Sequence, residues 1–303
     1  MAAHFFLIVK IALATSDKYP HLTDDDRLLL RPLAALGLEA EPAVWDNSCT
    51  DWLHFAAVVI RSCWDYHLKP KAFLEWIAKL DSARIPVFNS PALLRWNTDK
   101  SYLRDLDAKG IDIVPTFWAD DHGFGSSIGH RMSLQGKLHQ LGWHKAVVKP
   151  RISATAYRTR LVTQDTADSA QALFDELQRG PGVMVQTFME SISSEGEWSL
   201  IFFDGKFSHA ILKKPRPGDF RVQNDFGGTS RLTEPPSHVL ASATRAVQAV
   251  EATAYARVDG VVDDNRFRLM ELELIEPMLF LADCADASTR FANTIAQALA
   301  RNT

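Results

Sequence analysis

Three carboxylates near the C-terminus have the spacing of a metal site. Residues 256–277 hold two runs of apolar and β-branched residues around the turn 263–266, a pattern that predicts a β-hairpin. Because side chains alternate along a strand, Glu271 and Glu273 share one face and the apolar residues take the other. If the turn holds an odd number of residues, Asp259 pairs opposite Glu271 on the same face. The three carboxylates then converge, and such all-oxygen ligands select Mg2+ or Mn2+.

The same pattern has a second interpretation, an amphipathic strand whose glutamates face water. The two interpretations differ in their need for a counter-charge. Like charges that face each other across a ladder destabilise it, so a converging cluster requires a compensating cation. The hairpin alone leaves both interpretations open.

Lysines upstream of the hairpin have the chemistry of a phosphate site. Residues 146–150 are typical of a strand that presents Lys149 at its end, and small residues flanked by arginines follow at 151–158. Such a turn offers backbone N–H groups and hydroxyls to phosphate oxygens. Lys100 is expected in the first turn of a helix capped by Thr98, where the helix dipole disfavours a cation unless an anion binds.

A second basic segment lies between two other predicted elements. The dipeptide Asp204-Gly205 between alternating apolar runs predicts another hairpin, and the basic, Pro/Gly-rich loop 213–221 follows it. A charge run is most often a solvated face. Here a long helix, expected over 237–255, returns the chain from the basic loop to the acidic hairpin, which favours a joint site.

Composition limits the class of protein and of partner. The chain has 303 residues, 47% of them hydrophobic and 23% charged, which predicts a globular protein and excludes disordered and collagen-like classes. The net charge of -4 argues against nucleic acid or an acidic membrane surface as the main partner. Its 3 cysteines are far apart, without a C-x-x-C motif, so a reducing cytoplasm is expected rather than a disulfide framework.

No segment predicts a membrane span or a signal peptide. The apolar run 4–14 is interrupted by Lys10 and lacks a basic region before it, so it is interpreted as a buried strand. No other stretch approaches the roughly 18 apolar residues that a membrane span needs.

The first 98 residues alternate strand and helix signals, as in a parallel α/β layer. Ligands bind beyond the carboxyl ends of such strands, so the loops 15–19 and 61–66 are where substrate contacts are expected. Arg61 could form a fork onto a carboxylate, or it could simply pair with Asp65. No G-x-G-x-x-G motif follows the first strand, which disfavours a dinucleotide site.

The order of these elements resembles the ATP-grasp superfamily over roughly the whole chain. The motifs that carry the resemblance are Lys100, V-V-K-P with Lys149, a loop of small residues, V-Q-T-F-M-E with Gln186, G-E-W-S-L, a basic loop and a terminal D…E-x-E hairpin. The resemblance implies an α/β ATP-grasp fold in three parts. These are an N-terminal parallel α/β domain over 1–98, a small lid subdomain over 99–190 and a C-terminal α+β nucleotide- and metal-binding domain over 191–303.

The resemblance also implies roles for the matched residues. Nucleotide contacts correspond to Lys100, Lys149, Ser153, Thr155, Gln186, Phe188 and Glu197. Catalytic and basic positions correspond to Lys149, Lys213, Lys214 and Arg221. Substrate contacts are expected at Asp17, Arg61, Asp65 and Arg221. The ligands of Mg2+ or Mn2+ correspond to Asp259, Glu271 and Glu273.

Two positions depart from the pattern of the family. The phosphate lid is usually rich in glycine, whereas Ser153, Ala154 and Thr155 occupy it here, which implies a stiffer lid with more hydroxyl contacts. The third metal position is more often asparagine than the Glu273 of this chain. Both departures leave the phosphate and metal chemistry in place.

ATP-grasp ligases phosphorylate a carboxylate, and an amine or similar nucleophile then attacks the acyl phosphate. The opening I-A-L-A-T, Tyr19-Pro20, R-S-C-W-D-Y and M-E-L-E-L-I-E-P most resemble the cycloserine-forming type, which closes O-ureido-D-serine into D-cycloserine with consumption of ATP. This implies antibiotic biosynthesis, a small amino-acid-like substrate and a homodimer. The alternatives are a glutathione-synthetase-like or RimK-like ligase that needs a separate amine, and a non-ligating phosphotransferase or regulatory module.

Overall fold

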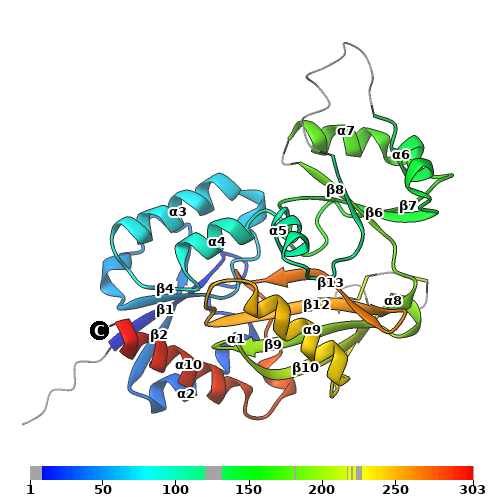
Figure 1. Cartoon of the computed structure of the whole chain (residues 1–303). Coiled ribbons are helices and arrows are strands. Elements are labelled where there is room, and N and C mark those ends of the chain that lie inside the picture. The colour runs from blue at the N-terminus through cyan, green and yellow to red at the C-terminus, as the bar shows by residue number, and fades with distance from the viewer. Residues whose placement is uncertain are drawn as a thin grey trace, which may run out of the picture.

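The chain folds around three β-sheets that lie in successive parts of the sequence (Figure 1). The computed structural model describes residues 9–119, 132–180, 182–216, 218–219, 221–222 and 227–302. Within these ranges no helix is both long and apolar enough to cross a membrane.

The first sheet is parallel, with the strand order β2-β1-β3-β4. It contains β1 (Val9–Thr15), β2 (Leu38–Val44), β3 (Ala57–Ile60) and β4 (Val87–Phe88), with helices α1 (Asp24–Arg27), α2 (Leu30–Ala35), α3 (Pro70–Ser82) and α4 (Pro91–Asn97) between and after the strands. The expected parallel layer is confirmed. Of the predicted first strand, residues 4–8 lie outside the described ranges.

The segment after β1 forms two short helices, since α1 ends before α2 begins. Thr23 caps the first of them, because its hydroxyl oxygen accepts a hydrogen bond from the backbone N–H of Asp26 at 3.1 Å. Pro32 lies in the first turn of α2, where its missing N–H removes no helical hydrogen bond.

The second sheet is antiparallel, with the order β5-β8-β6-β7. It contains β5 (Thr116–Ala119), β6 (Lys145–Pro150), β7 (Arg160–Thr163) and β8 (Val183–Thr187), and α6 (Leu134–Leu141) and α7 (Gln171–Arg179) cover one face (Figure 1). Val148 and Val185 face these helices. The alternation of the strands therefore directs Lys149 and Gln186 to the opposite face.

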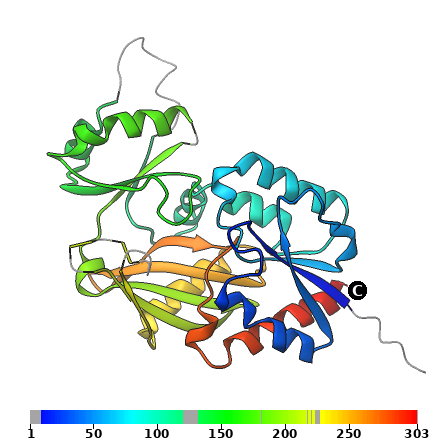
Figure 2. The ribbon, with the colours of Figure 1, turned by 180° about the vertical axis from the view of Figure 1, so that it is seen from behind.

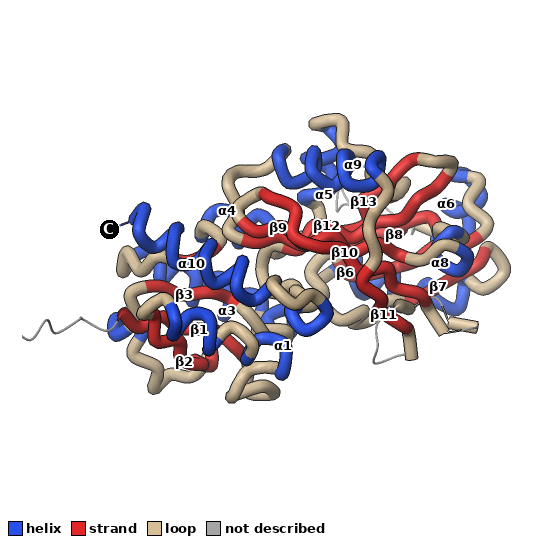
Figure 3. The backbone as a smooth tube through the Cα atoms, turned by 90° about the horizontal axis from the view of Figure 1, so that it is seen from below, coloured by secondary structure: helices blue, strands red, loops and turns tan. Residues whose placement is uncertain are grey.

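The third sheet is also antiparallel, with the order β11-β10-β9-β12-β13. It contains β9 (Glu197–Phe203), β10 (Lys206–Lys214), β11 (Thr229–Leu232), β12 (Tyr255–Asp263) and β13 (Arg266–Glu273), and α9 (Ser237–Gln248) covers one face (Figure 3). The hairpin predicted at Asp204-Gly205 is confirmed. The predicted helix over 237–255 is too long, because α9 ends at Gln248 and Tyr255 already begins β12.

One hydrophobic core joins the first and third sheets. The C-terminal helix α10 (Ala287–Asn302) returns to the first sheet and packs beside α2 (Figure 2). The core includes Leu13 from β1, Phe203 from β9 and Phe291 from α10, and the last two rings stack with centroids 4.8 Å apart. The strand ends of the first sheet are thereby held in a fixed position next to the third sheet.

Candidate active site

The acidic hairpin has the predicted pairing but a different turn. Asp263 pairs with Arg266, so the turn has two residues, Asp264 and Asn265, both with positive φ. A turn of odd length was therefore the wrong expectation. A β-bulge lies between the pairs Gly260–Leu269 and Asp259–Glu271, and its extra residue is Met270. The bulge restores the register that places Asp259 opposite Glu271.

The bulge also separates Met270 from the residues with which it was expected to pack. Leu272 and Leu274 enter the main core together with Leu269. Met270 instead contacts a smaller cluster that contains Val114 and Val261. The three predicted carboxylates remain on the opposite face of the strands from that main core.

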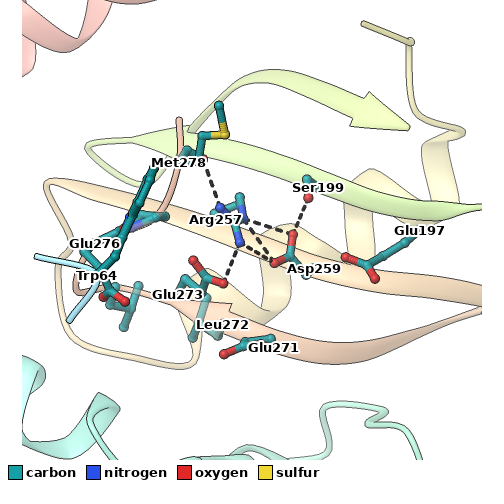
Figure 4. Close-up of polar contacts among 12 residues, drawn as sticks. Trp64, Glu197, Ser199, Arg257, Asp259, Glu271, Leu272, Glu273, Glu276 and Met278 are labelled. Atoms are coloured by element: carbon teal, nitrogen blue, oxygen red, sulfur yellow. Dashed lines mark hydrogen bonds and ion pairs between the residues drawn. The ribbon is translucent and has the colours of Figure 1, made fainter. Parts of the chain in front are cut away.

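Each of the three predicted carboxylates contacts a protein cation, and Figure 4 shows Arg257 between two of them. The Arg257 guanidinium lies between Asp259, at 2.9 Å, and Glu273, at 2.5 Å. Lys213 Nζ contacts Glu197 at 2.5 Å and Asp259 at 3.6 Å. Ser199, opposite Asp259 on β9, donates its hydroxyl to the same carboxylate.

The glutamates do not simply face water, as the alternative interpretation supposed. The side chains of Asp259, Glu271 and Glu273 are 6%, 26% and 25% exposed. Burial, together with the charges of Glu271 and Asp259, raises the pKa of Glu273 to about 7 despite Arg257. The face therefore carries more negative charge than the neighbouring cations fully compensate.

This donor set fits a hard divalent cation, although the side chains are not gathered around one point. Across the described residues no three His, Cys, Asp or Glu side chains are arranged as a metal site. Asp259 and Glu271 face each other across the ladder, while Arg257 holds Glu273 and Lys100 holds Glu271. A metal at this face would take carboxylate oxygens that these two cations now occupy.

Lys100 connects the acidic strand to the turn of small residues. Its ammonium donates to the backbone carbonyl of Ser153 at 2.5 Å and contacts Glu271 at 2.8 Å. Burial alone would lower the pKa of Lys100, but the Glu271 carboxylate raises it. Two residues that are 171 positions apart in the chain thus form one ion pair.

The predicted helical setting of Lys100 is wrong. The helix α5 (Tyr102–Ala108) begins two residues after it. Thr98 follows α4, and its hydroxyl donates to the Leu94 carbonyl at 2.8 Å instead of capping a new helix. The ion pair with Glu271, rather than the dipole of a helix, therefore sets the electrostatic environment of Lys100.

Lys149 is the least compensated cation of the group. Its side chain has no hydrogen bond or ion pair to any residue that the structure describes. Burial, with a smaller contribution from the charge of Lys100, lowers the pKa of Lys149 to about 8, although Glu271 and Glu197 oppose the change. A buried amine of this kind gains stabilisation from an anion such as phosphate.

The turn of small residues adopts a backbone that glycine would favour. Thr155, Ala156 and Arg158 all have positive φ, of +50°, +55° and +52°. Ser153 is buried and its hydroxyl donates to the Pro150 carbonyl at 3.2 Å, whereas Thr155 is exposed. The absence of glycine here therefore leaves the left-handed conformation in place but adds strain to it.

The residues matched to adenine and ribose contacts lie in β8, directly after β8 and at the start of β9. Gln186 is buried, and its side-chain amide donates to the Thr116 hydroxyl at 3.2 Å. Phe188 lies beneath Lys145, with the ammonium 3.8 Å from the ring centroid. Glu197 is paired with Lys213, and burial raises the pKa of its carboxyl.

The two other basic positions contact different groups. Arg221 pairs with Asp219 at 2.8 Å, and Lys214 is exposed and donates to the Ser194 carbonyl at 3.2 Å. Positions 217, 220 and 223–226 of this loop lie outside the described residues. Among the described basic residues of the loop, it is Lys213 that contacts the carboxylate face.

Arg61, where a substrate contact was expected, lies in the interior of the protein. The side chain is 1% exposed, and its guanidinium donates to Asp26 and to the Pro277 carbonyl, each at 2.8 Å. The alternative pairing with Asp65 is wrong as well, since Asp65 accepts from the Trp45 indole at 2.8 Å. Arg61 thus links α1 to the segment after β13.

Asp17 and Asp65 are not brought together with the carboxylate face. Asp17 is exposed in the loop after β1, and Asp65 faces Trp45 and Lys69. The loop residue that does reach the acidic segment is Trp64, whose indole donates to the Glu276 carbonyl at 3.0 Å.

Sequence reasoning missed Arg257 and Glu276. Arg257 lies two residues before Asp259, so the period of a strand already places both on one face. Glu276 lies after the end of β13, so the alternation of side chains along a strand does not predict its orientation. Its burial depends on tertiary contacts.

Comparisons with known proteins point in one direction. Residues 11–89 match the family described as the N-terminal domain of D-cycloserine synthetase DcsG. The chain is 30% identical over 282 residues to the cycloserine biosynthesis protein DcsG of Streptomyces lavendulae, which covers 89% of this chain and 92% of that relative.

Solved structures agree with the sequence relationship. The crystal structure of D-cycloserine synthetase DcsG superposes with a TM-score of 0.84 at 27% identity, covering 96% of this chain and 99% of that one. D-alanine–D-alanine ligase from Bacillus anthracis gives 0.69 at 16% identity over 97% of this chain and 98% of its own. A RimK-domain ATP-grasp protein from Sphaerobacter thermophilus gives 0.69 at 17% identity, over 94% and 98%. The prediction of the ATP-grasp fold is confirmed.

Proposed function

The chain belongs to the D-cycloserine synthetase DcsG family of ATP-dependent ligases, and on this premise we propose that it closes O-ureido-D-serine into D-cycloserine. The proposal has ATP phosphorylate the substrate carboxylate, after which a nitrogen of the same molecule attacks the acyl phosphate. The observation that carries it is the buried Lys100–Glu271 pair, which joins the carboxylate face to the turn at Ser153.

The lysines supply positive charge where the phosphoryl group moves. Lys149 has a lowered pKa and no partner among the described residues, so the phosphates of ATP can become its counter-ion. In the proposal Lys100, which lies next to the turn of small residues, contacts the same phosphates. Preorganised charges in a buried site stabilise a transferring phosphoryl group without reorganisation of water.

The carboxylates Asp259, Glu271 and Glu273 would hold Mg2+ or Mn2+. Such an ion would supply positive charge that offsets the negative charge of the ATP phosphates and so favours transfer of the γ-phosphoryl group. Arg257 then has a second role in the proposal. As a buried guanidinium between Asp259 and Glu273, it keeps the carboxylates in place and carries donors suited to an acyl phosphate oxygen.

The nucleotide base and ribose would lie along the edge that holds Gln186, Phe188 and Glu197. Ser153 and Thr155 would cover the phosphates from the turn, and Lys213 and Arg221 would contribute charge from the basic loop. Covering the phosphates excludes water, which would otherwise hydrolyse the acyl phosphate.

Ring closure needs only one substrate besides ATP. The carboxylate oxygen takes the γ-phosphoryl group and ADP leaves. The nitrogen bonded to the side-chain oxygen attacks the carbonyl carbon, loses a proton and expels phosphate. Water then hydrolyses the carbamoyl group that this nitrogen carries, which leaves as ammonia and carbon dioxide, and D-cycloserine remains. Because both reacting groups are in one molecule, the reaction gains the advantage of intramolecular attack.

The proposal includes a homodimer in the cytoplasm. The three cysteines are free, with Cys63 buried, as expected in a reducing compartment. Light scattering coupled to size exclusion tests the dimer, and a mass equal to one chain would contradict it.

The function is tested by measuring ADP release across candidate acids and amines, with mass detection of the product. Turnover should require O-ureido-D-serine and no amine. The Lys149→Ala variant should lose phosphoryl transfer and nucleotide binding far more than Lys149→Arg, which retains a cation. Equal ADP affinity in wild type and Lys149→Ala by calorimetry would remove this lysine from the site.

A further inference from the structure

Glu276 is a buried carboxylate with no cation paired to it. Glu276 is 8% exposed, and no described Lys, Arg or His forms an ion pair with its carboxylate. The carboxylate accepts a hydrogen bond from its own backbone N–H. The other acidic residues on the site face differ, since Glu197, Asp259, Glu271 and Glu273 each contact a protein cation.

An unpaired carboxylate in this position is costly to keep. Burial, together with the nearby charges of Glu273 and Glu271, raises the pKa of Glu276 well above its usual value. The carboxylates of its immediate neighbourhood are negative, and the charge of Lys100 and the backbone N–H of Glu276 act in the other direction. A cationic group of a ligand would therefore be stabilised here more than at any carboxylate that already has a partner.

The Trp64 side chain, from the loop after β3, lies beside Glu276 (Figure 4). The Trp64 indole donates to the Glu276 carbonyl at 3.0 Å, and Tyr19 meets Trp64 edge-on with ring centroids 5.1 Å apart. Both rings come from loops beyond the carboxyl ends of β1 and β3, and both are only partly buried. A carboxylate beside aromatic rings is the combination that recognises an ammonium group.

Glu276 also lies next to the groups assigned to phosphoryl transfer. In Figure 4 the carboxylates form a row in which Glu197 is at one end and Glu276, beside Trp64, is at the other. Glu273, Glu271 and Lys100 are close enough to shift the pKa of Glu276. An amino acid carries its ammonium and its carboxylate on the same carbon, so a residue that binds the ammonium must adjoin the place where the carboxylate is phosphorylated.

We infer that Glu276, with Trp64 beside it, binds the α-ammonium group of the amino-acid substrate and so selects an α-amino acid over other carboxylic acids. This inference rests on the proposed function, because it assigns one end of the substrate to one residue. In this inference Trp64 is the substrate contact from the region where β3 ends, in place of Arg61 and Asp65.

The test uses Glu276→Gln, which keeps the shape of the side chain but removes its charge. The probes are O-ureido-D-serine and its analogue without the amino group, 3-(ureidooxy)propanoate. The kcat/KM of the wild type should be roughly 100-fold higher for the amino acid than for the analogue, because removing one partner of a buried charge pair commonly has an effect of this size. In the variant this preference should shrink to within a few-fold, because the amino acid loses its counter-ion and the analogue does not.

Two controls accompany this variant. Glu75→Gln removes an exposed glutamate of α3 and should leave the preference unchanged. ADP affinity, measured by calorimetry, should equal that of wild type in both variants, which shows that the fold and the nucleotide site are intact. If Glu276→Gln does not fold, Glu276→Asp serves instead, and its shorter carboxylate should give an intermediate preference.

Binding of O-ureido-D-serine without ATP gives a second readout. Its Kd by calorimetry should rise roughly 100-fold in Glu276→Gln. An unchanged Kd and an unchanged preference for the amino acid would overturn the inference, and so would a loss of kcat with the preference intact, which would indicate a proton-transfer role. A failure of the proposed function is distinct, since wild type would then not turn over O-ureido-D-serine at all.

Discussion

At the scale of single residues, the site is defined by how its charges are compensated. Lys100, Lys213 and Arg257 each contact a carboxylate, whereas Lys149 has a lowered pKa and Glu276 a raised one. Perturbed pKa values of both signs in one cleft are typical of sites that bind charged ligands. Lys149 and Glu276, which have no ion pair to any described residue, are assigned a phosphate and an ammonium group of the ligands.

The lowered pKa of Lys149 predicts a pH dependence of nucleotide binding. Below pH 8 the free amine is mostly protonated and available to phosphate. As pH rises through about 8, the free protein loses this proton, whereas bound phosphate would hold it, so ADP affinity should fall by up to about tenfold per pH unit. Calorimetry in two buffers of different ionisation enthalpy should detect proton uptake on binding at pH 8.5.

The matched control for that experiment is Lys149→Arg. A guanidinium keeps its proton throughout this range, so its ADP affinity should be independent of pH between 7 and 9. If the wild type were equally independent of pH, the amine would not titrate in the free protein.

Glu271 belongs to both the metal site and the ion pair with Lys100. The Glu271→Gln variant should lose at least about 100-fold in turnover, because it removes a proposed metal ligand and a partner of Lys100. Steady-state ADP release at saturating Mg2+ measures the effect. The control Glu39→Gln alters an exposed glutamate of β2, and wild-type turnover in Glu271→Gln would contradict the assignment.

At the scale of elements, Arg61 acts as a tie between helix α1 and the end of the acidic hairpin. Replacing it with Leu should lower the free energy of unfolding by about 3–5 kcal/mol, because Asp26 would remain buried without its partner. Urea denaturation measures this loss. Arg95→Leu, which breaks an exposed pair with Asp81, should cost less than about 1 kcal/mol.

A similar loss of unfolding free energy in both variants would show that the buried pair stabilises the protein no more than the exposed pair does. The variant also separates stability from substrate binding. Arg61→Leu protein that remains folded should keep the wild-type ADP affinity, since the guanidinium contacts Asp26 and Pro277 rather than any of the residues that we assign to the nucleotide.

The turn of small residues provides a matched pair of alanines. Ala156 has a positive φ of +55°, whereas Ala154, two residues earlier, is outside the positive-φ region. Ala156→Gly should therefore be neutral or stabilising, and Ala154→Gly should destabilise, with a difference of about 1 kcal/mol between them. Thermal unfolding measures both, and equal effects of the two substitutions would contradict the strained conformation.

The order and type of the elements could be predicted from the sequence where local signals were strong. The Asp204-Gly205 hairpin, α3 with its proline start, and the parallel strands of the first sheet all follow from turn residues and periodicity. The break between α1 and α2 and the early end of α9 could not be predicted, because tertiary packing overrides propensity at helix ends.

The site could be predicted only in part, again because tertiary contacts are not visible in local sequence patterns. Asp259 and Glu271 pair as expected, but a two-residue turn with a bulge and a longer odd turn give the same register, so sequence could not distinguish them. Arg61 looked like a ligand because it follows a buried strand. Its partners, Asp26 and Pro277, are far from it in sequence, and no local pattern reports such contacts.

At the scale of the whole molecule, the two faces of the site come from sheets with different anchoring. The first and third sheets share a core through α10, so the Glu276 and Trp64 region is held rigidly. The second sheet carries Lys149 and reaches the acidic hairpin through contacts such as Lys100 with the Ser153 carbonyl. The proposed chemistry requires that ATP be held between these two faces.

The central claim is that ATP activates a carboxylate for attack by a nitrogen of the same molecule. The most direct test is incubation with ATP, Mg2+ and O-ureido-D-serine labelled with 18O in its carboxylate, with no amine added. We predict ADP, a cyclic product and one labelled oxygen in each phosphate released, since that oxygen bridges the acyl phosphate. Unlabelled phosphate, or activity that appears only when a separate amine is supplied, would contradict the account.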